Sequence, residues 1–89
     1  MLLEEFLVPM GLSQRDVAES IGVPYQRVNE IVNGRRGISP GTALRLGKYL
    51  GTTPDFWLNV QQRWDLYNAL RGERDALQRI KPVRESKAA

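Results

Sequence analysis

Apolar residues recur along the chain at the three- and four-residue spacing of amphipathic helices. No segment shows the period of two that is typical of a half-buried strand. Glycine or proline interrupts the pattern at short intervals, which predicts short helices joined by tight turns. The sequence therefore predicts an all-α fold of five helices. We expect the first from near Met1 to Pro9, and the others at 13–21, 25–33, 40–50 and about 54–71.

Capping residues stand in front of three of these segments. Ser13, with Asp16 three positions later, forms a capping-box sequence in which Asp replaces Glu. Ser39-Pro40 and Thr53-Pro54 each place a capping hydroxyl before a proline in the first helical turn. These signals predict the starts of the second, fourth and fifth helices.

The two ends of the chain are less regular. The first helix begins at the chain start with no capping residue before it, so we expect further residues upstream in the complete protein. Near the other end, we expect Gly72 to break the long helix before a weaker helical stretch that ends near Lys81. Residues 1–81 are thus predicted to form one domain, followed by a disordered basic tail at 82–89.

The segment at 13–34 carries the residue types that a helix-turn-helix requires. Counting from Gln14, small Ala18 stands fifth, where the two helices cross closely. Gly22 stands ninth, where a tight turn needs left-handed backbone. Two apolar residues occupy the fifteenth and eighteenth positions, where the second helix packs on the core: Val28 and Ile31. This spacing predicts a helix-turn-helix core; a helical hairpin with no nucleic-acid role is the alternative.

Helical rotation places the polar residues of the second helix on the side opposite Val28. Gln and Asn can bond adenine, Arg can bond guanine, and Glu can accept from cytosine. We expect base contacts from this face: Tyr25, Gln26, Arg27, Asn29 and Glu30. The alternative is an ordinary solvated surface, on which Arg27 and Glu30 pair with each other.

Phosphate contacts are expected on both sides of that face. Backbone N–H groups point outward at the N-terminus of the first helix of the motif, where an anion is favoured. The Asn-Gly-Arg-Arg-Gly loop follows the second helix. The predicted phosphate-binding residues are Gln14, Asn33, Arg35 and Arg36. Residues 25–48 carry five cations against one acid, a net charge of +4, which is typical of a surface that binds double-stranded DNA.

Composition narrows the chemistry further. The chain has no cysteine and no histidine, so thiol nucleophiles, imidazole bases and the commonest metal ligands are missing. We expect no enzyme activity, no metal and no cofactor. The longest apolar stretch, residues 6–12, is far shorter than the roughly 20 residues that a membrane helix needs. Glu4 and Glu5 stand where a signal peptide would carry positive charge, so we expect a cytoplasmic protein that does not bind membranes.

Together these motifs resemble a known family. Residues 12–34 and 38–46 resemble the phage-repressor-like (XRE) helix-turn-helix family. The Phe-Trp-Leu-Asn-Val-Gln segment at 56–61 resembles the HigA branch of antitoxins, also called the VapI type, and the resemblance covers about residues 2–72. It implies a dimeric repressor of its own operon that neutralises a RelE-like toxin (HigB), which cleaves mRNA on the ribosome. It also implies DNA contacts at Gln14, Tyr25, Gln26, Glu30 and Asn33.

Two features depart from the family pattern. Relatives usually carry a short Pro-Gly-Glu segment before the position of Leu2, and it is absent here. Gly41 stands where they often have Glu, which loosens the start of the fourth helix. The first departure leaves the role of the N-terminal end open.

The last long helix carries more apolar surface than a small monomer can bury. One seam follows spacings of three, four and three residues: Trp57, Val60, Trp64 and Tyr67. We expect this seam to form the interface of a homodimer, which places two recognition helices about 34 Å apart on an inverted-repeat operator. The alternative is that all of these side chains belong to the core of one chain.

Two other functions fit the sequence. One is a stand-alone XRE-family regulator with no toxin partner, and the other is a purely protein-binding helical module whose basic block is solvated surface. Salt-dependent binding to an inverted repeat separates the last of these from the DNA-binding functions.

Overall fold

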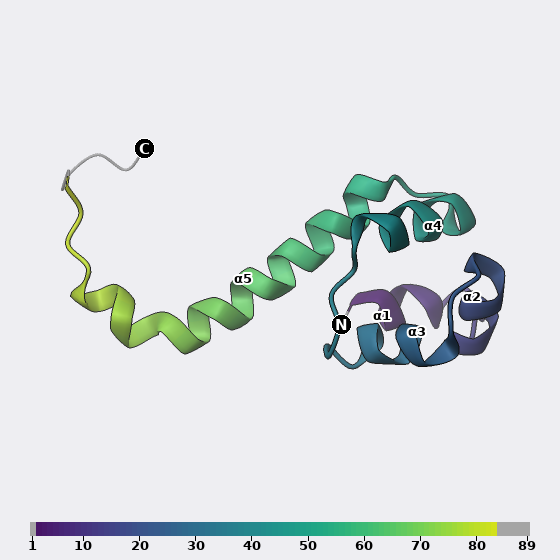
Figure 1. The fold of residues 1–89 in the computed structure, drawn as a ribbon, viewed down its shortest axis with the longest axis horizontal. Coiled ribbons are helices and arrows are strands. Elements are labelled where there is room, and N and C mark those ends of the chain that lie inside the picture. Colours follow the sequence, from purple (N-terminus) through teal and green to yellow (C-terminus); the bar gives the residue numbers. More distant parts are fainter. Residues whose placement is uncertain (1, 84–89) are drawn as a thin grey trace.

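Five helices joined by short turns make up residues 2–83, the part of the chain that the computed structural model describes (Figure 1). The helices are α1 (Leu2–Leu7), α2 (Gln14–Ile21), α3 (Tyr25–Val32), α4 (Pro40–Leu50) and α5 (Pro54–Arg79). The predicted all-α class with five helices is confirmed, and the bounds of α2, α3 and α4 lie within a residue of those expected. The predicted tail at 82–89 lies mostly outside the described residues.

The capping signals form as expected. The Ser13 hydroxyl accepts from the Asp16 N–H at 3.0 Å, and the Asp16 carboxylate accepts from the Ser13 N–H at 3.1 Å. The hydrogen bond that the Ser13 N–H donates to the carboxylate holds the pKa of Asp16 below its ordinary value. Ser39 and Thr53 cap α4 and α5 through the N–H groups of Thr42 and Phe56. Local sequence alone therefore determines where these three helices begin.

A single hydrophobic core is shared by the helices α1, α2, α3 and α4 and by the first turn of α5. Its members are buried apolar side chains from all five helices and from the loop before α4: Leu3, Leu7, Val17, Ala18, Ile21, Val28, Ile31, Val32, Ile38, Ala43, Leu46 and Trp57. Of these, Trp57 is the largest fully buried side chain, and its ring packs edge-on against Phe6 and Phe56 at centroid distances of 5.3 and 4.9 Å. Its indole N–H donates to the Thr52 hydroxyl at 2.7 Å, which satisfies the one polar group it buries.

Beyond the core, α5 extends away from the helical head as an arm (Figure 1). The molecule measures 50 × 23 × 22 Å, and its radius of gyration of 16.7 Å exceeds the roughly 12 Å of a compact chain of this length. No helix within residues 2–83 is long and apolar enough to cross a membrane.

The predicted break at Gly72 is wrong, because α5 continues through it to Arg79. One exposed glycine costs a helix about 1 kcal/mol relative to alanine, which is too little to end a run of strong helix formers on both sides. The helix ends where Pro82 restricts the residue before it to extended backbone.

Candidate nucleic-acid interface

The tight turn between α2 and α3 has the geometry that its sequence predicts. Gly22 adopts φ +74°, in the left-handed region, and the N–H groups of Gly22 and Val23 both donate to the Ala18 carbonyl at 3.0 Å. Ala18 is buried where the helices cross. A Cβ on Gly22 would lie 3.2 Å from the Arg45 guanidinium, so a side chain there would meet both strain and crowding.

The two faces of α3 divide as the sequence predicts. Val28, Ile31 and Val32 are buried against the core. Tyr25, Gln26 and Arg27 are exposed on the outward side, and Asn29 and Glu30 are partly exposed. These five polar and aromatic side chains thus share the face of α3 that a nucleic acid could reach. They differ in their hydrogen-bond partners.

Glu30 lies between two neighbours on this face. The Arg36 Nε group donates to its carboxylate at 2.8 Å, and the Gln26 amide donates to it at 3.5 Å. The hydrogen bond from Arg36 holds the pKa of Glu30 below its ordinary value. Arg36 comes from the loop after α3, so the structure neutralises the one acidic residue of the recognition face with a cation predicted to bind phosphate.

Asn29 links α3 to α2 through side-chain amides. Its Nδ2 group donates to the Gln14 Oε1 atom at 2.9 Å, and its Oδ1 atom accepts from the Asn33 Nδ2 group at 3.1 Å. Gln14 is the first residue of α2 and is partly buried. Two predicted phosphate ligands and one predicted base reader therefore form a single hydrogen-bonded chain.

Arg15 belongs to this surface, although sequence reasoning did not single it out. Its guanidinium lies over the Tyr25 ring, 5.1 Å from the ring centroid. Ser13, Gln14, Arg15 and Tyr25 line one shallow hollow at the N-terminus of α2. The available signal was its place beside Gln14 in the first turn of α2, where a cation next to outward N–H groups adds to an anion site.

The loop that carries Arg35 and Arg36 is fixed by α5. Gly34 turns the chain at φ +74°, and its Cα faces the Trp64 ring so closely that a Cβ would lie 3.2 Å from it. Four residues later, the Ile38 N–H donates to the Gln61 side chain at 2.9 Å. Arg35 and Arg36 lie between these two contacts. The packing of α5 therefore fixes the backbone from which both arginine side chains extend.

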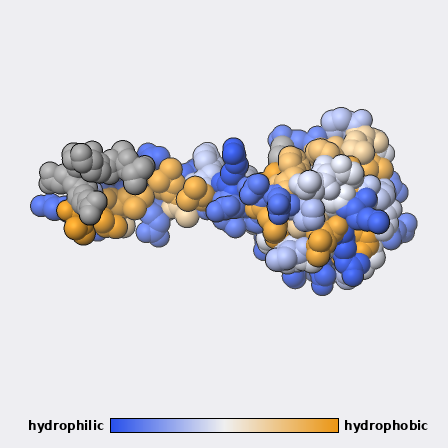
Figure 2. Space-filling view, turned by 90° about the horizontal axis from the view of Figure 1, so that it is seen from above, coloured by the Kyte–Doolittle hydropathy of each residue, from blue (hydrophilic) through white to orange (hydrophobic). Residues whose placement is uncertain are grey.

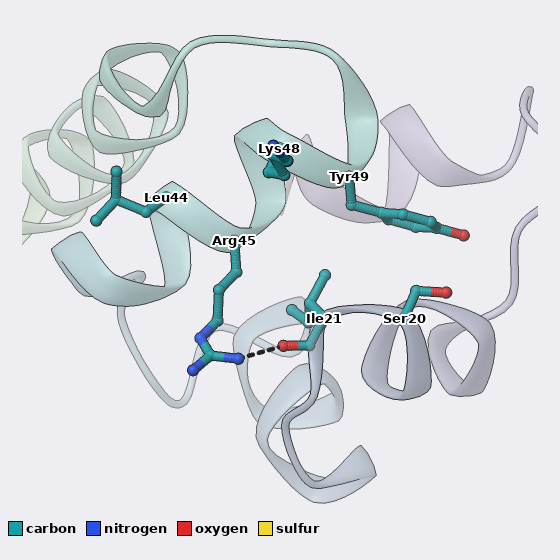
Figure 3. A pocket seen from close by; sticks show the side chains of 6 residues that line it. All are labelled: Ser20, Ile21, Leu44, Arg45, Lys48 and Tyr49. Atoms are coloured by element: carbon teal, nitrogen blue, oxygen red, sulfur yellow. Dashed lines mark hydrogen bonds between the residues drawn. The ribbon is translucent and has the colours of Figure 1, made fainter.

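The remaining cations of the predicted basic block lie elsewhere. Arg45 donates to the Ile21 carbonyl at 2.6 Å, at the C-terminus of α2, and so satisfies an end of that helix (Figure 3). Arg45 and Lys48 line a second hollow at this end of α2, together with Ser20 and Tyr49 (Figure 3). These two cations of the 25–48 block therefore lie near the C-terminus of α2, at the other end of that helix from Gln14.

The predicted dimer seam on α5 is also changed by the structure. Trp57 is 0% exposed inside the core of its own chain, so its assignment to a subunit interface is wrong. Spacing could not show that the first turn of α5 already packs against Phe6 of α1. Val60 and Trp64 are partly buried, and Tyr67 is 57% exposed.

Further apolar side chains are exposed along the arm, where they form orange patches in Figure 2. They are Leu66, Leu70, Leu77 and Ile80. At about 100° per residue, Leu66, Leu70 and Leu77 lie within roughly 40° of one another on one side of α5, and Ile80 follows as the C-cap. The part of the structure that is described therefore leaves an apolar stripe on the arm with nothing packed on it.

A short helix, a left-handed glycine turn and a second helix with an exposed polar face define a helix-turn-helix protein. Comparison with known proteins agrees with this class. The HTH_3 family model, described as Helix-turn-helix, matches residues 3–57. The chain belongs to this XRE-type helix-turn-helix family and groups within it with the HigA and VapI antitoxins.

Three relatives indicate the extent of the similarity. Virulence-associated protein I of Dichelobacter nodosus is 49% identical over 65 residues, which span 73% of this chain but only 60% of that protein. Antitoxin HigA-1 of Vibrio cholerae is 37% identical over 83 residues, covering 93% of this chain and 78% of HigA-1. The structure of Pseudomonas aeruginosa antitoxin HigA with the higBA promoter has a TM-score of 0.82 at 34% identity, covering 93% and 91% of the two chains.

Proposed function

We propose that this chain is an antitoxin and a sequence-specific DNA-binding repressor that binds the operator of its own operon. The observation that carries the proposal is the exposed polar face of α3, with Gln14 on one side of it and Arg35 and Arg36 on the other. The similarity to Pseudomonas aeruginosa HigA, which was solved with the higBA promoter, supports DNA as the ligand.

The surroundings of each side chain support a division of roles on this face. Gln26 and Arg27 are exposed and have the donors and acceptors that distinguish base edges in the major groove. Gln14 at the N-terminus of α2, and Arg35 in the loop, are placed to bind the backbone on either side. Arg36 can reach a phosphate only by leaving Glu30 or by bridging the two, so its contribution depends on that carboxylate.

A homodimer is part of the proposal. The exposed arm residues support it, because a second copy would cover the stripe of Leu66, Leu70, Leu77 and Ile80 that one chain leaves in water. Tyr67 and Val60 lie about 60–80° round the helix from Leu70, whereas Trp64 lies about 120° away and packs on Gly34 of its own chain. Two-fold symmetry would place the two α3 helices one DNA turn apart and would make the operator an inverted repeat.

We also propose a toxin partner of the RelE-like (HigB) type, on the strength of the similarity to antitoxin HigA-1. The toxin would have to bind away from α3 for one complex to repress and neutralise together. A stand-alone regulator of the same family would have the same fold and the same DNA face but no such partner.

Co-purification separates these functions. We expect a tagged chain, expressed from its own locus, to retain a stoichiometric small protein that arrests growth when it is produced alone. Co-expression of this chain should restore growth. Recovery of the chain alone, from cells that grow normally after its gene is deleted, would contradict the antitoxin role and leave a plain repressor. Absence of DNA binding in either preparation would favour a protein-binding module.

A further inference from the structure

Asn29 has the residue type and the helix position of a base reader, but one N–H and one oxygen lone pair of its amide are already engaged within the protein. A bidentate contact with adenine requires a free carbonyl oxygen and a free N–H on the same amide edge. In this structure the Asn29 Nδ2 group donates to Gln14 at 2.9 Å, and its Oδ1 atom accepts from Asn33 at 3.1 Å. Asn29 is also only partly exposed, unlike Gln26 and Arg27 earlier in the same helix.

The direction of the amide chain determines what Gln14 can bind. Because the Gln14 Oε1 atom accepts from Asn29, the Nε2 group is the part of its amide left for a ligand. A phosphate oxygen only accepts hydrogen bonds, so a donor in that position is complementary to the DNA backbone.

The end of α2 adds backbone donors at the same place. Ser13 accepts hydrogen bonds from two N–H groups of the first turn of α2. Its hydroxyl accepts from Asp16, and its carbonyl accepts from Val17. The N–H groups of Gln14 and Arg15 are therefore the ones that can face an anion. The Arg15 guanidinium, held over Tyr25, lines the same hollow.

We propose that Asn29 is a positioning residue and not a base reader. It orients the Gln14 amide so that its N–H₂ group points towards one backbone phosphate at the N-terminus of α2. Asn33 completes the chain by fixing the Asn29 amide in turn. The hydrogen bond between Asn29 and Gln14 ties α3 to the phosphate contact of α2. This bond touches no base, yet it fixes how deeply α3 lies in the groove. The inference rests on the proposed DNA binding.

A double-mutant cycle tests the link. We expect Asn29→Ala and Gln14→Ala each to weaken operator binding by about tenfold, and the double variant to be little weaker than either. Preference at every base pair should stay as in the unmodified chain. Gln26→Ala is the matched control on the same helix, and its effect should add to that of Gln14→Ala.

Additive effects of Asn29→Ala and Gln14→Ala would overturn the proposal, as would a relaxed preference at one base pair in Asn29→Ala. A second readout needs no DNA: in the free protein, the Gln14 side-chain amide should lose NMR order in Asn29→Ala while the backbone of α2 does not. Unchanged order would also overturn it. If the unmodified chain fails to bind any operator while the NMR result holds, the proposed function is wrong but the link stands.

Discussion

Replacing Leu70 by glutamate is expected to convert the protein from a dimer to a monomer and to weaken operator binding by roughly 100-fold or more. Leu70 is 52% exposed in a single chain, so the substitution should cost the folded monomer little. In a dimer that covers the arm, the same position would bury an unpaired carboxylate, which is strongly unfavourable. Monomers would then bind each half-site alone and lose the gain of linked binding, typically about 10²–10⁴.

Light scattering at micromolar concentration measures the first effect, and titration of a full operator measures the second. Asn68→Glu is the matched control, because it adds the same charge two residues away on a side of α5 about 160° from Leu70. It should leave the mass unchanged. A dimeric mass for Leu70→Glu, or a monomeric mass for the unmodified chain, would contradict an arm-mediated dimer.

Replacing Trp57 by alanine is expected to cost about 3–5 kcal/mol of unfolding free energy. The side chain is fully buried against Phe6 and Phe56, and its N–H is bonded to Thr52. Small domains are stable by only about 5–15 kcal/mol in total, so this variant should lose a large fraction of the stability of the fold.

Urea unfolding followed by circular dichroism, at one fixed protein concentration, measures the loss. Trp64→Ala is the natural control, since Trp64 is only partly buried and packs on the surface of Gly34. Its midpoint should shift much less. Equal shifts for the two tryptophans would mean that Trp57 does not hold the core together in the way described.

The helix-turn-helix could be predicted from sequence because its determinants are local. A capping box, a small residue at the crossing and a glycine in the turn each act within a few positions, and Ser13, Ala18 and Gly22 do what those positions require. The polar face of α3 follows from helical rotation once Val28 is known to be buried.

The rest depended on which elements meet, and periodicity carries no such information. The bond from Asn29 to Gln14 joins residues fifteen positions apart, and the bond from Gln61 to Ile38 joins residues twenty-three apart. Trp57 and Trp64 share one helical face, yet one lies under α1 and the other over Gly34. Only the packing of α5 on the head decides which apolar residues of that helix remain for a partner.

The measurement that tests the central claim most directly is the affinity of the chain for DNA taken from upstream of its own gene, as a function of salt. An inverted repeat there should bind about 10³-fold or more tightly than a scrambled duplex of the same composition. With about four phosphates engaged per subunit, the logarithm of the binding constant should fall with the logarithm of salt concentration at a slope near −7. Equal affinity for both duplexes, or binding that does not change with salt, would contradict a DNA-reading role for α2 and α3.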